Sequence, residues 1–103
     1  MSYTPTTGYR MITGLKMELQ RVNYEDDSLD IDQNEEGLHA ALEVEVEGEI
    51  RLIEVHYSLI DDCGLLTMVE HRWDGETGRL EPMYPRIMSL EKFSDWVTDL
   101  EEF

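Results

Sequence analysis

The stretch Leu38–Ile60, LHAALEVEVEGEIRLIEVHYSLI, decides the fold. Apolar residues alternate with polar ones over 38–46, which is the pattern of a β-strand with one buried face. Glu47 and Gly48 then supply a two-residue turn, with glycine where a positive φ is needed. A second strand follows over 49–60, so the stretch predicts an antiparallel β-hairpin.

The turn sets the register of this hairpin, because directly opposed residues of an antiparallel pair share one face of the sheet. With Glu47 and Gly48 in the loop, Val46 pairs with Glu49. We therefore expect one face to be buried and the other exposed. Three further pairs build the apolar face: Leu42 with Ile53, Ala40 with Val55, and Leu38 with Tyr57.

The segments after the hairpin continue the sheet. A turn at 61–64 leads to a strand over 65–73, and a second turn follows. Residues 79–88 contain two prolines, which restrict them to an edge strand or an irregular return. The chain therefore predicts a meander, in which consecutive strands are neighbours in the sheet.

The C-terminal segment has the pattern of an amphipathic helix. Ser89 is a good N-cap, and Glu91 in the first turn complements the helix dipole. Apolar residues at helical spacing form one stripe, which we expect to face the sheet: Leu90, Phe93, Trp96, Val97 and Leu100.

The N-terminal third is harder to interpret. Apolar residues alternate with polar ones, and Gly14 disfavours a helix, so we expect a strand over 15–23. Residues 1–9 and 25–37 are polar and are expected to be flexible, the second of them as either a mobile loop or a short strand.

Together these elements predict an α+β fold in a single domain over 1–103. We expect an antiparallel β-meander of four to five strands, with a C-terminal α-helix packed on one face. Tyr84 and Phe103 are expected to be exposed, and Tyr84 is a candidate anchor for a protein partner. The aromatic residues expected in the core are Tyr57, Trp73, Phe93 and Trp96.

The charge of the chain limits its partners. With 24 acidic and 8 basic residues the formal net charge is −16, which disfavours direct binding to nucleic-acid phosphates and to anionic membranes. No apolar run is long enough to span a bilayer, no signal peptide is visible, and the single cysteine cannot form an intramolecular disulfide. We therefore expect a cytoplasmic protein.

Many of the acids lie in two rows. Glutamates alternate along the first hairpin strand at about 6.6 Å, and acids recur along one side of the C-terminal helix at about 6 Å. Both spacings resemble the phosphate repeat of a nucleic-acid strand, so such rows can occupy a basic groove. The alternative is that each row is an ordinary solvated face. The candidate binding residues are Glu43, Glu45, Glu47, Glu91, Asp95, Asp99 and Glu102, with Tyr84 as the anchor.

No group of residues marks a catalytic or metal site. In the hairpin register His39 lies opposite His56 with Glu54 nearby, and His71 joins them if the next turn keeps the same parity. Histidines with a carboxylate form a zinc-ligand set, but the chain has no HxH or HExxH motif. Cys63 follows two aspartates, which disfavour a nucleophilic thiolate. We therefore expect no enzyme activity, no cofactor and no bound metal.

In size and charge the chain resembles small acidic inhibitors. These are the nucleic-acid mimics with which phages block host defence, such as anti-CRISPR and anti-restriction proteins, and the immunity proteins that cap nuclease toxins. The resemblance rests on composition alone. It implies a non-enzymatic inhibitor, monomeric or a small homo-oligomer, that binds a basic nucleic-acid-binding protein. The alternatives are an immunity protein, a small metal- or ligand-binding domain using His39 and His56, and an accessory subunit kept soluble by its charge.

Overall fold

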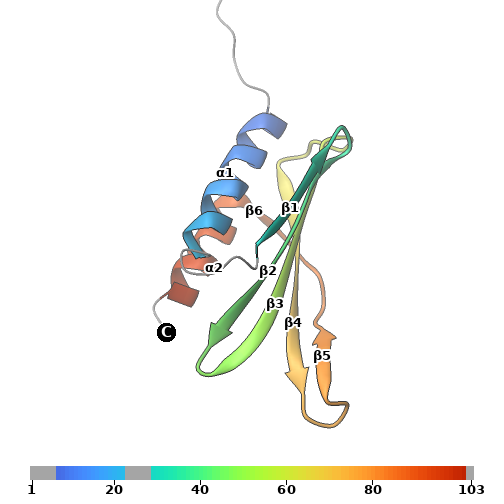
Figure 1. The fold of residues 1–103 in the computed structure, drawn as a ribbon. Helices are drawn as coiled ribbons and strands as arrows, with labels where there is room; N and C mark the ends of the chain where they lie inside the picture. The colour runs from blue at the N-terminus through green and yellow to red at the C-terminus, as the bar shows by residue number, and fades with distance from the viewer. Residues whose placement is uncertain (1–6, 23–28, 102–103) are drawn as a thin grey trace, which may run out of the picture.

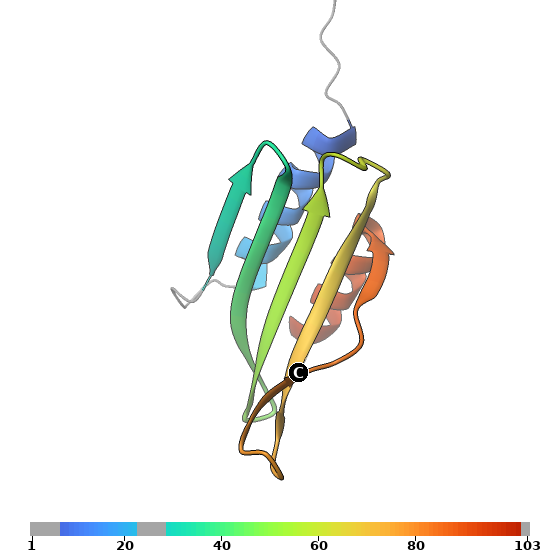
Figure 2. The same ribbon diagram turned by 90° about the vertical axis from the view of Figure 1, so that its right-hand side faces the viewer.

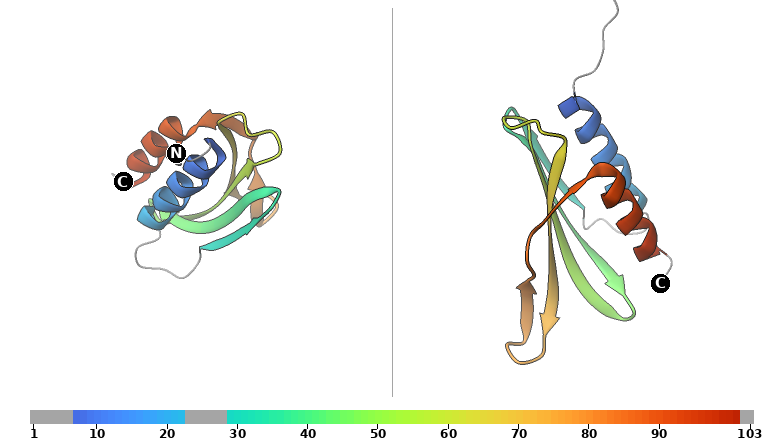
Figure 3. Two further views of the ribbon diagram at one scale, coloured as in Figure 1. Left: turned by 90° about the horizontal axis from the view of Figure 1, so that it is seen from above. Right: turned by 180° about the vertical axis from the view of Figure 1, so that it is seen from behind.

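A computed structural model describes residues 7–22 and 29–101. Strands β1 to β5 form an antiparallel meander, and β6 pairs with the first half of β4. Both helices lie on one face of this sheet (Figures 1 and 3), so the predicted α+β class is confirmed. The elements are α1 (Thr7–Val22), β1 (Asp30–Asn34), β2 (Gly37–Val46), β3 (Glu49–Ser58), β4 (Leu65–Asp74), β5 (Arg79–Pro82), β6 (Arg86–Ser89) and α2 (Leu90–Glu101).

The β2–β3 hairpin has the predicted register. Its turn consists of Glu47 and Gly48, whose φ angles of 53° and 82° are both left-handed, as a two-residue hairpin turn of this hand requires. The predicted pairs are confirmed: Val46 with Glu49, Leu42 with Ile53, Ala40 with Val55, and Leu38 with Tyr57.

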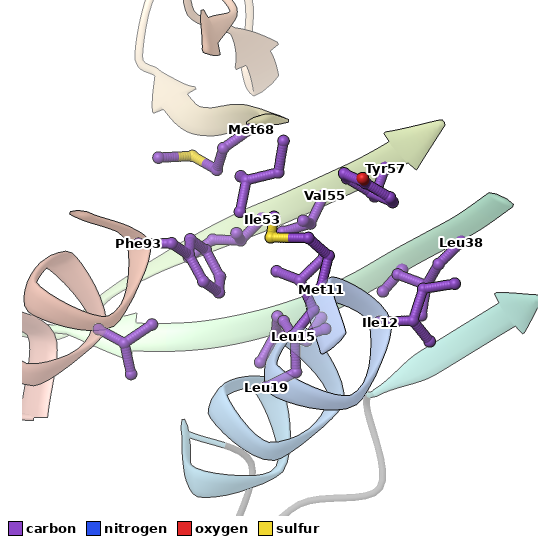
Figure 4. Packing of buried hydrophobic residues seen from close by; sticks show 14 residues of the cluster. Met11, Ile12, Leu15, Leu19, Leu38, Ile53, Val55, Tyr57, Met68 and Phe93 are labelled. Carbon is purple, nitrogen blue, oxygen red and sulfur yellow. The ribbon is translucent and has the colours of Figure 1, made fainter. Parts of the chain in front are cut away.

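The core lies between the helices and one face of the sheet, which we call the inner face (Figure 4). Leu38, Tyr57 and Phe93 are at most 1% exposed there. The stripe of α2 packs into this core as predicted, and the Ser89 hydroxyl accepts a hydrogen bond from the Lys92 N–H at 3.2 Å, which confirms the N-cap. Within residues 7–22 and 29–101, the helices therefore cover the inner face of the sheet and leave the other face uncovered.

The strand expected over 15–23 is wrong over 15–22, because these residues belong to helix α1, and residue 23 lies outside the described residues. Leu15 and Leu19 are buried at helical spacing, whereas Met17 between them is 64% exposed. In a strand all three side chains would share one face. The exposure of Met17 therefore shows that helical periodicity governs this segment.

Gly14 lies inside α1 for a packing reason. A Cβ atom at this position would clash with the Leu90 side chain at the start of α2. Further along, the Arg21 guanidinium donates hydrogen bonds to the Thr98 hydroxyl at 3.0 Å and to the Ser94 carbonyl oxygen at 3.3 Å. The glycine therefore allows the close approach of two helices that are also joined by polar contacts.

The segments expected to be flexible fall partly within regular structure. Residues 7–9 belong to the first turns of α1, and residues 30–34 form the edge strand β1, with Ile31 packed against the core. Residues 1–6 and 25–28 lie outside the described residues. Of the two alternatives for 25–37, the short strand is therefore present over 30–34.

Tyr57 combines burial with a polar contact. It is 1% exposed, and its hydroxyl donates a hydrogen bond to the Asp62 carboxylate at 2.5 Å. Burial, followed by this hydrogen bond, raises the pKa of Tyr57 to about 12 from the ordinary value of 10.0. The folded chain therefore holds the phenol proton more tightly than the unfolded chain does.

This raised pKa predicts a loss of stability in alkali. The stabilising contribution is complete below about pH 10 and is lost as the pH rises towards about 12, with a total of about 3 kcal/mol. Urea unfolding across this range measures the loss. The Tyr57→Phe variant is the control, because it lacks the titrating group and should show a shallower decline. Equal declines for both proteins would contradict the assignment.

Candidate interaction surface

The face of the sheet opposite the helices, which we call the outer face, carries the predicted acids Glu43 and Glu45 and the predicted histidines. Figure 2 looks onto this face, with both helices behind the strands. Because the strands are paired in register, its residues follow directly from the pairs of β2, β3 and β4. They include Glu43 and Glu45 of β2, Ile50, Leu52, Glu54 and His56 of β3, and His71 and Trp73 of β4.

The acidic row of β2 lies where the sequence places it. Glu43 and Glu45 are exposed on the outer face, and Glu47 is exposed in the turn that follows. The other face of the same strand is anchored by Leu38, which is fully buried, and by Leu42 at 2% exposure. The carboxylates are therefore attached to a strand that the core holds in place.

The acidic row of α2 lies on a different surface. Glu91, Asp95 and Asp99 are exposed on the side of the helix turned away from the core, and Glu102 lies outside the described residues. Because α2 packs on the inner face, this side and the outer face of the sheet are opposite surfaces of the molecule (Figure 3). The structure therefore does not bring the two rows together.

The exposed aromatics differ in part from the prediction. Tyr84 is 92% exposed between β5 and β6, as predicted. Trp73 is 55% exposed, so its predicted place in the core is wrong. Trp73 has the same parity as His71, two residues earlier, and therefore points to the outer face near the end of β4. Phe103 lies outside the described residues.

Trp73 helps to line a groove at the turn end of the sheet. The groove has a volume of about 490 Å³. This groove could not be predicted from the sequence, because it depends on where pairing between β3 and β4 ends. Its lining residues are Glu43, Gly48, Glu49 and Ile50 from the first hairpin, and Trp73 and Leu80 from the second.

The histidines gather around one carboxylate on the outer face. Glu54 Oε2 is 3.1 Å from His39 Nε2, and Glu54 Oε1 is 2.6 Å from His71 Nε2. The predicted pairing of His39 with His56 is confirmed, with ring centroids 6.4 Å apart. Among residues 7–22 and 29–101, no group of three or more His, Cys, Asp or Glu side chains is arranged to hold a metal ion.

A buried carboxylate on the inner face was missed by sequence reasoning. Glu70 is 5% exposed and contacts the guanidinium groups of Arg51 at 3.0 Å, Arg72 at 3.3 Å and Arg86 at 3.8 Å. A signal was present in the hairpin register, since Arg51 pairs with Val44 and so falls on the inner face. A cation there needs an acidic partner.

The comparisons with known proteins return no match: no family model, no curated protein and no solved structure is significantly similar to this chain. Over the described part of the chain, neither helix is long and apolar enough to cross a lipid bilayer.

Proposed function

We propose that the protein is a non-enzymatic inhibitor that binds a basic, nucleic-acid-binding protein through Glu43, Glu45 and Glu47. The position of these residues carries the proposal, because Glu43 and Glu45 lie on the sheet face opposite the two described helices and Glu47 lies in the adjoining turn. A row fixed on a packed strand loses little conformational freedom when it binds. Its spacing of about 6.6 Å resembles that of phosphates along one strand of nucleic acid.

The acids of α2 have a different role in this proposal. Since they face away from the β2 row, one flat partner surface cannot cover both. They add instead to the field of a chain with net charge −16, which accelerates the encounter with a basic partner over distances of about 10 Å. Contact is thus assigned to β2 and its turn, and long-range attraction to the whole chain.

Matched charge reversals test this division. One variant carries Glu43→Lys, Glu45→Lys and Glu47→Lys, and the control carries Glu91→Lys, Asp95→Lys and Asp99→Lys. Both change the net charge equally, and all six residues are exposed. We expect the wild type to capture a basic protein from a lysate of the native host at physiological salt. The β2 variant should bind at least about tenfold more weakly, and the α2 variant should lose much less.

The captured protein is then purified, and its binding to nucleic acid is measured with and without the inhibitor. Equal losses for both triple variants would show that diffuse charge, and not the β2 row, makes the contact. Capture that does not weaken as salt rises would exclude the electrostatic mechanism. Unchanged binding of the partner to nucleic acid would exclude inhibition by mimicry. A partner identified as a nuclease toxin would favour the immunity-protein alternative.

A further inference from the structure

We propose that the groove at the turn end of the sheet anchors an extended segment of the partner, in which a large apolar side chain is flanked by arginines or lysines. This inference rests on the proposed function and adds the part of the partner that is recognised.

The groove exists because two hairpins diverge. Pairing between β3 and β4 ends at Leu52 with His71. In contrast, β2–β3 pairing continues to Glu49, and β4–β5 pairing continues to Asp74. Beyond the last β3–β4 pair the hairpins therefore extend as separate arms, which Figure 1 shows moving apart. The volume of about 490 Å³ between them is within the range of sites that hold a small ligand or a side chain with its neighbours.

The floor of the groove is apolar and accessible. Ile50 is 52% exposed and Trp73 is 55% exposed, and Leu80 lies beside Trp73 as its pair across β4 and β5. Single exposed apolar residues such as Ile60 are common on protein surfaces. Here three apolar side chains line one hollow, and a ligand that covers them removes their apolar surface from water, which favours binding.

The rim of the groove is acidic. Glu43 and Glu49 line it, Glu45 is the cross-strand neighbour of Ile50, and Glu47 lies in the adjacent turn. No lysine or arginine is among the lining residues. An arginine at this rim can pair with a carboxylate and also stack on the indole of Trp73. The apolar floor and the acidic rim therefore favour a ligand that combines an apolar side chain with positive charge.

Three arginines next to groove residues in the sequence are paired with carboxylates that do not line the groove. Arg51 and Arg72 contact Glu70, and Arg79 contacts Glu81, with distances between 2.7 and 3.3 Å. A second copy of the chain is a poor occupant, because it would bring two acidic rims together in a protein of net charge −16. The occupant with complementary charge is a basic segment that presents an apolar side chain.

A fluorescence titration tests the groove directly. The chain has two tryptophans, Trp73 and Trp96, and the Trp96→Phe variant leaves Trp73 as the reporter. The probe is a short peptide with one central leucine flanked by arginines. We expect saturable binding with a blue shift of the Trp73 emission. A peptide with a central alanine should bind at least about tenfold more weakly, and a peptide flanked by glutamates should not bind.

Two variants in the same background complete the test, and circular dichroism confirms their folding. Ile50→Ser should weaken binding of the leucine peptide at least about tenfold. Ile60→Ser is the matched control, since Ile60 is exposed but does not line the groove, and it should bind as the parent does.

Several results would overturn the groove assignment. Equal binding of the alanine peptide and the leucine peptide would show that charge alone drives binding. Equal weakening by Ile60→Ser and Ile50→Ser would show that the groove is not the binding site. A blue shift that grows with protein concentration in the absence of peptide would assign the groove to a second copy. If the leucine peptide causes no shift of the Trp73 emission, the groove does not anchor an apolar side chain. The proposed role of Glu43, Glu45 and Glu47 is tested separately, by the capture experiment with the charge-reversed variants.

Discussion

Replacing Glu70 with alanine is expected to lower the free energy of unfolding by about 3 kcal/mol. The carboxylate accepts hydrogen bonds from Arg51 at 3.0 Å and from Arg72 at 3.3 Å, and it is almost fully buried. Its removal leaves Arg51, whose side chain is only 17% exposed, without its main counter-charge. Urea unfolding at neutral pH, followed by circular dichroism, measures the loss.

Glu81 provides the matched control for this prediction. It accepts a hydrogen bond from Arg79 at 2.7 Å, which lowers the pKa of its carboxyl, but both side chains are accessible to water. Glu81→Ala should therefore change the unfolding midpoint little. The double variant Glu70→Leu with Arg51→Met should recover most of the stability, because an apolar pair can replace a buried ion pair. Equal effects of Glu70→Ala and Glu81→Ala would contradict the importance of burial.

The β2–β3 hairpin could be predicted because the residues that specify its strands and its turn are contiguous in the sequence. Alternation over 38–46, interrupted at Ala41 alone, identifies the buried face, and a two-residue turn at Glu47 and Gly48 allows one register. From that register follow the placement of Glu43 and Glu45 on the outer face and the pairing of His39 with His56. Each of these conclusions needs only neighbouring residues and the period of a strand.

Helix α1 could not be predicted in the same way. Leu15, Met17 and Leu19 alternate with polar residues, which is the period of a strand. Leu15 and Leu19 are also four residues apart, which fits the period of a helix, so this short segment is compatible with both. Only packing decides between them, by burying Leu15 and Leu19 and leaving Met17 in solvent. Gly14 favoured the strand interpretation because glycine has a low helix propensity. In the structure its lack of a side chain leaves space for Leu90.

The candidate surface was predictable in its charge but not in its shape. The register places the acids, whereas the point at which β3 and β4 separate depends on how the hairpins twist in three dimensions. The predicted burial of Trp73 is wrong for a related reason. Its large apolar side chain favours burial, but its position in β4 places it on the face of the sheet that the helices do not cover. The position of a residue in a strand thus outweighs its hydrophobicity where no second layer covers the sheet.

Replacing Gly37 with alanine is expected to lower the free energy of unfolding by about 4 kcal/mol. Gly37 opens β2 with a φ of 151°, which residues with a side chain rarely adopt. A Cβ atom there would also collide with the backbone carbonyl oxygen of Tyr57 on β3. Neither partner can move freely, because Tyr57 is buried and the preceding Glu36 carbonyl accepts a hydrogen bond from the Leu59 N–H at 2.8 Å.

Gly48→Ala separates the two causes of this loss. Gly48 also has a left-handed φ, of 82°, but a Cβ atom there meets no atom within 4 Å. Its replacement should cost only the conformational strain, about 1 kcal/mol. Urea unfolding of both variants gives the difference, which measures the collision with Tyr57. Equal losses would mean that the strand can shift away from Tyr57, whereas a much larger loss for Gly37→Ala would show that the core fixes the close approach of β2 and β3.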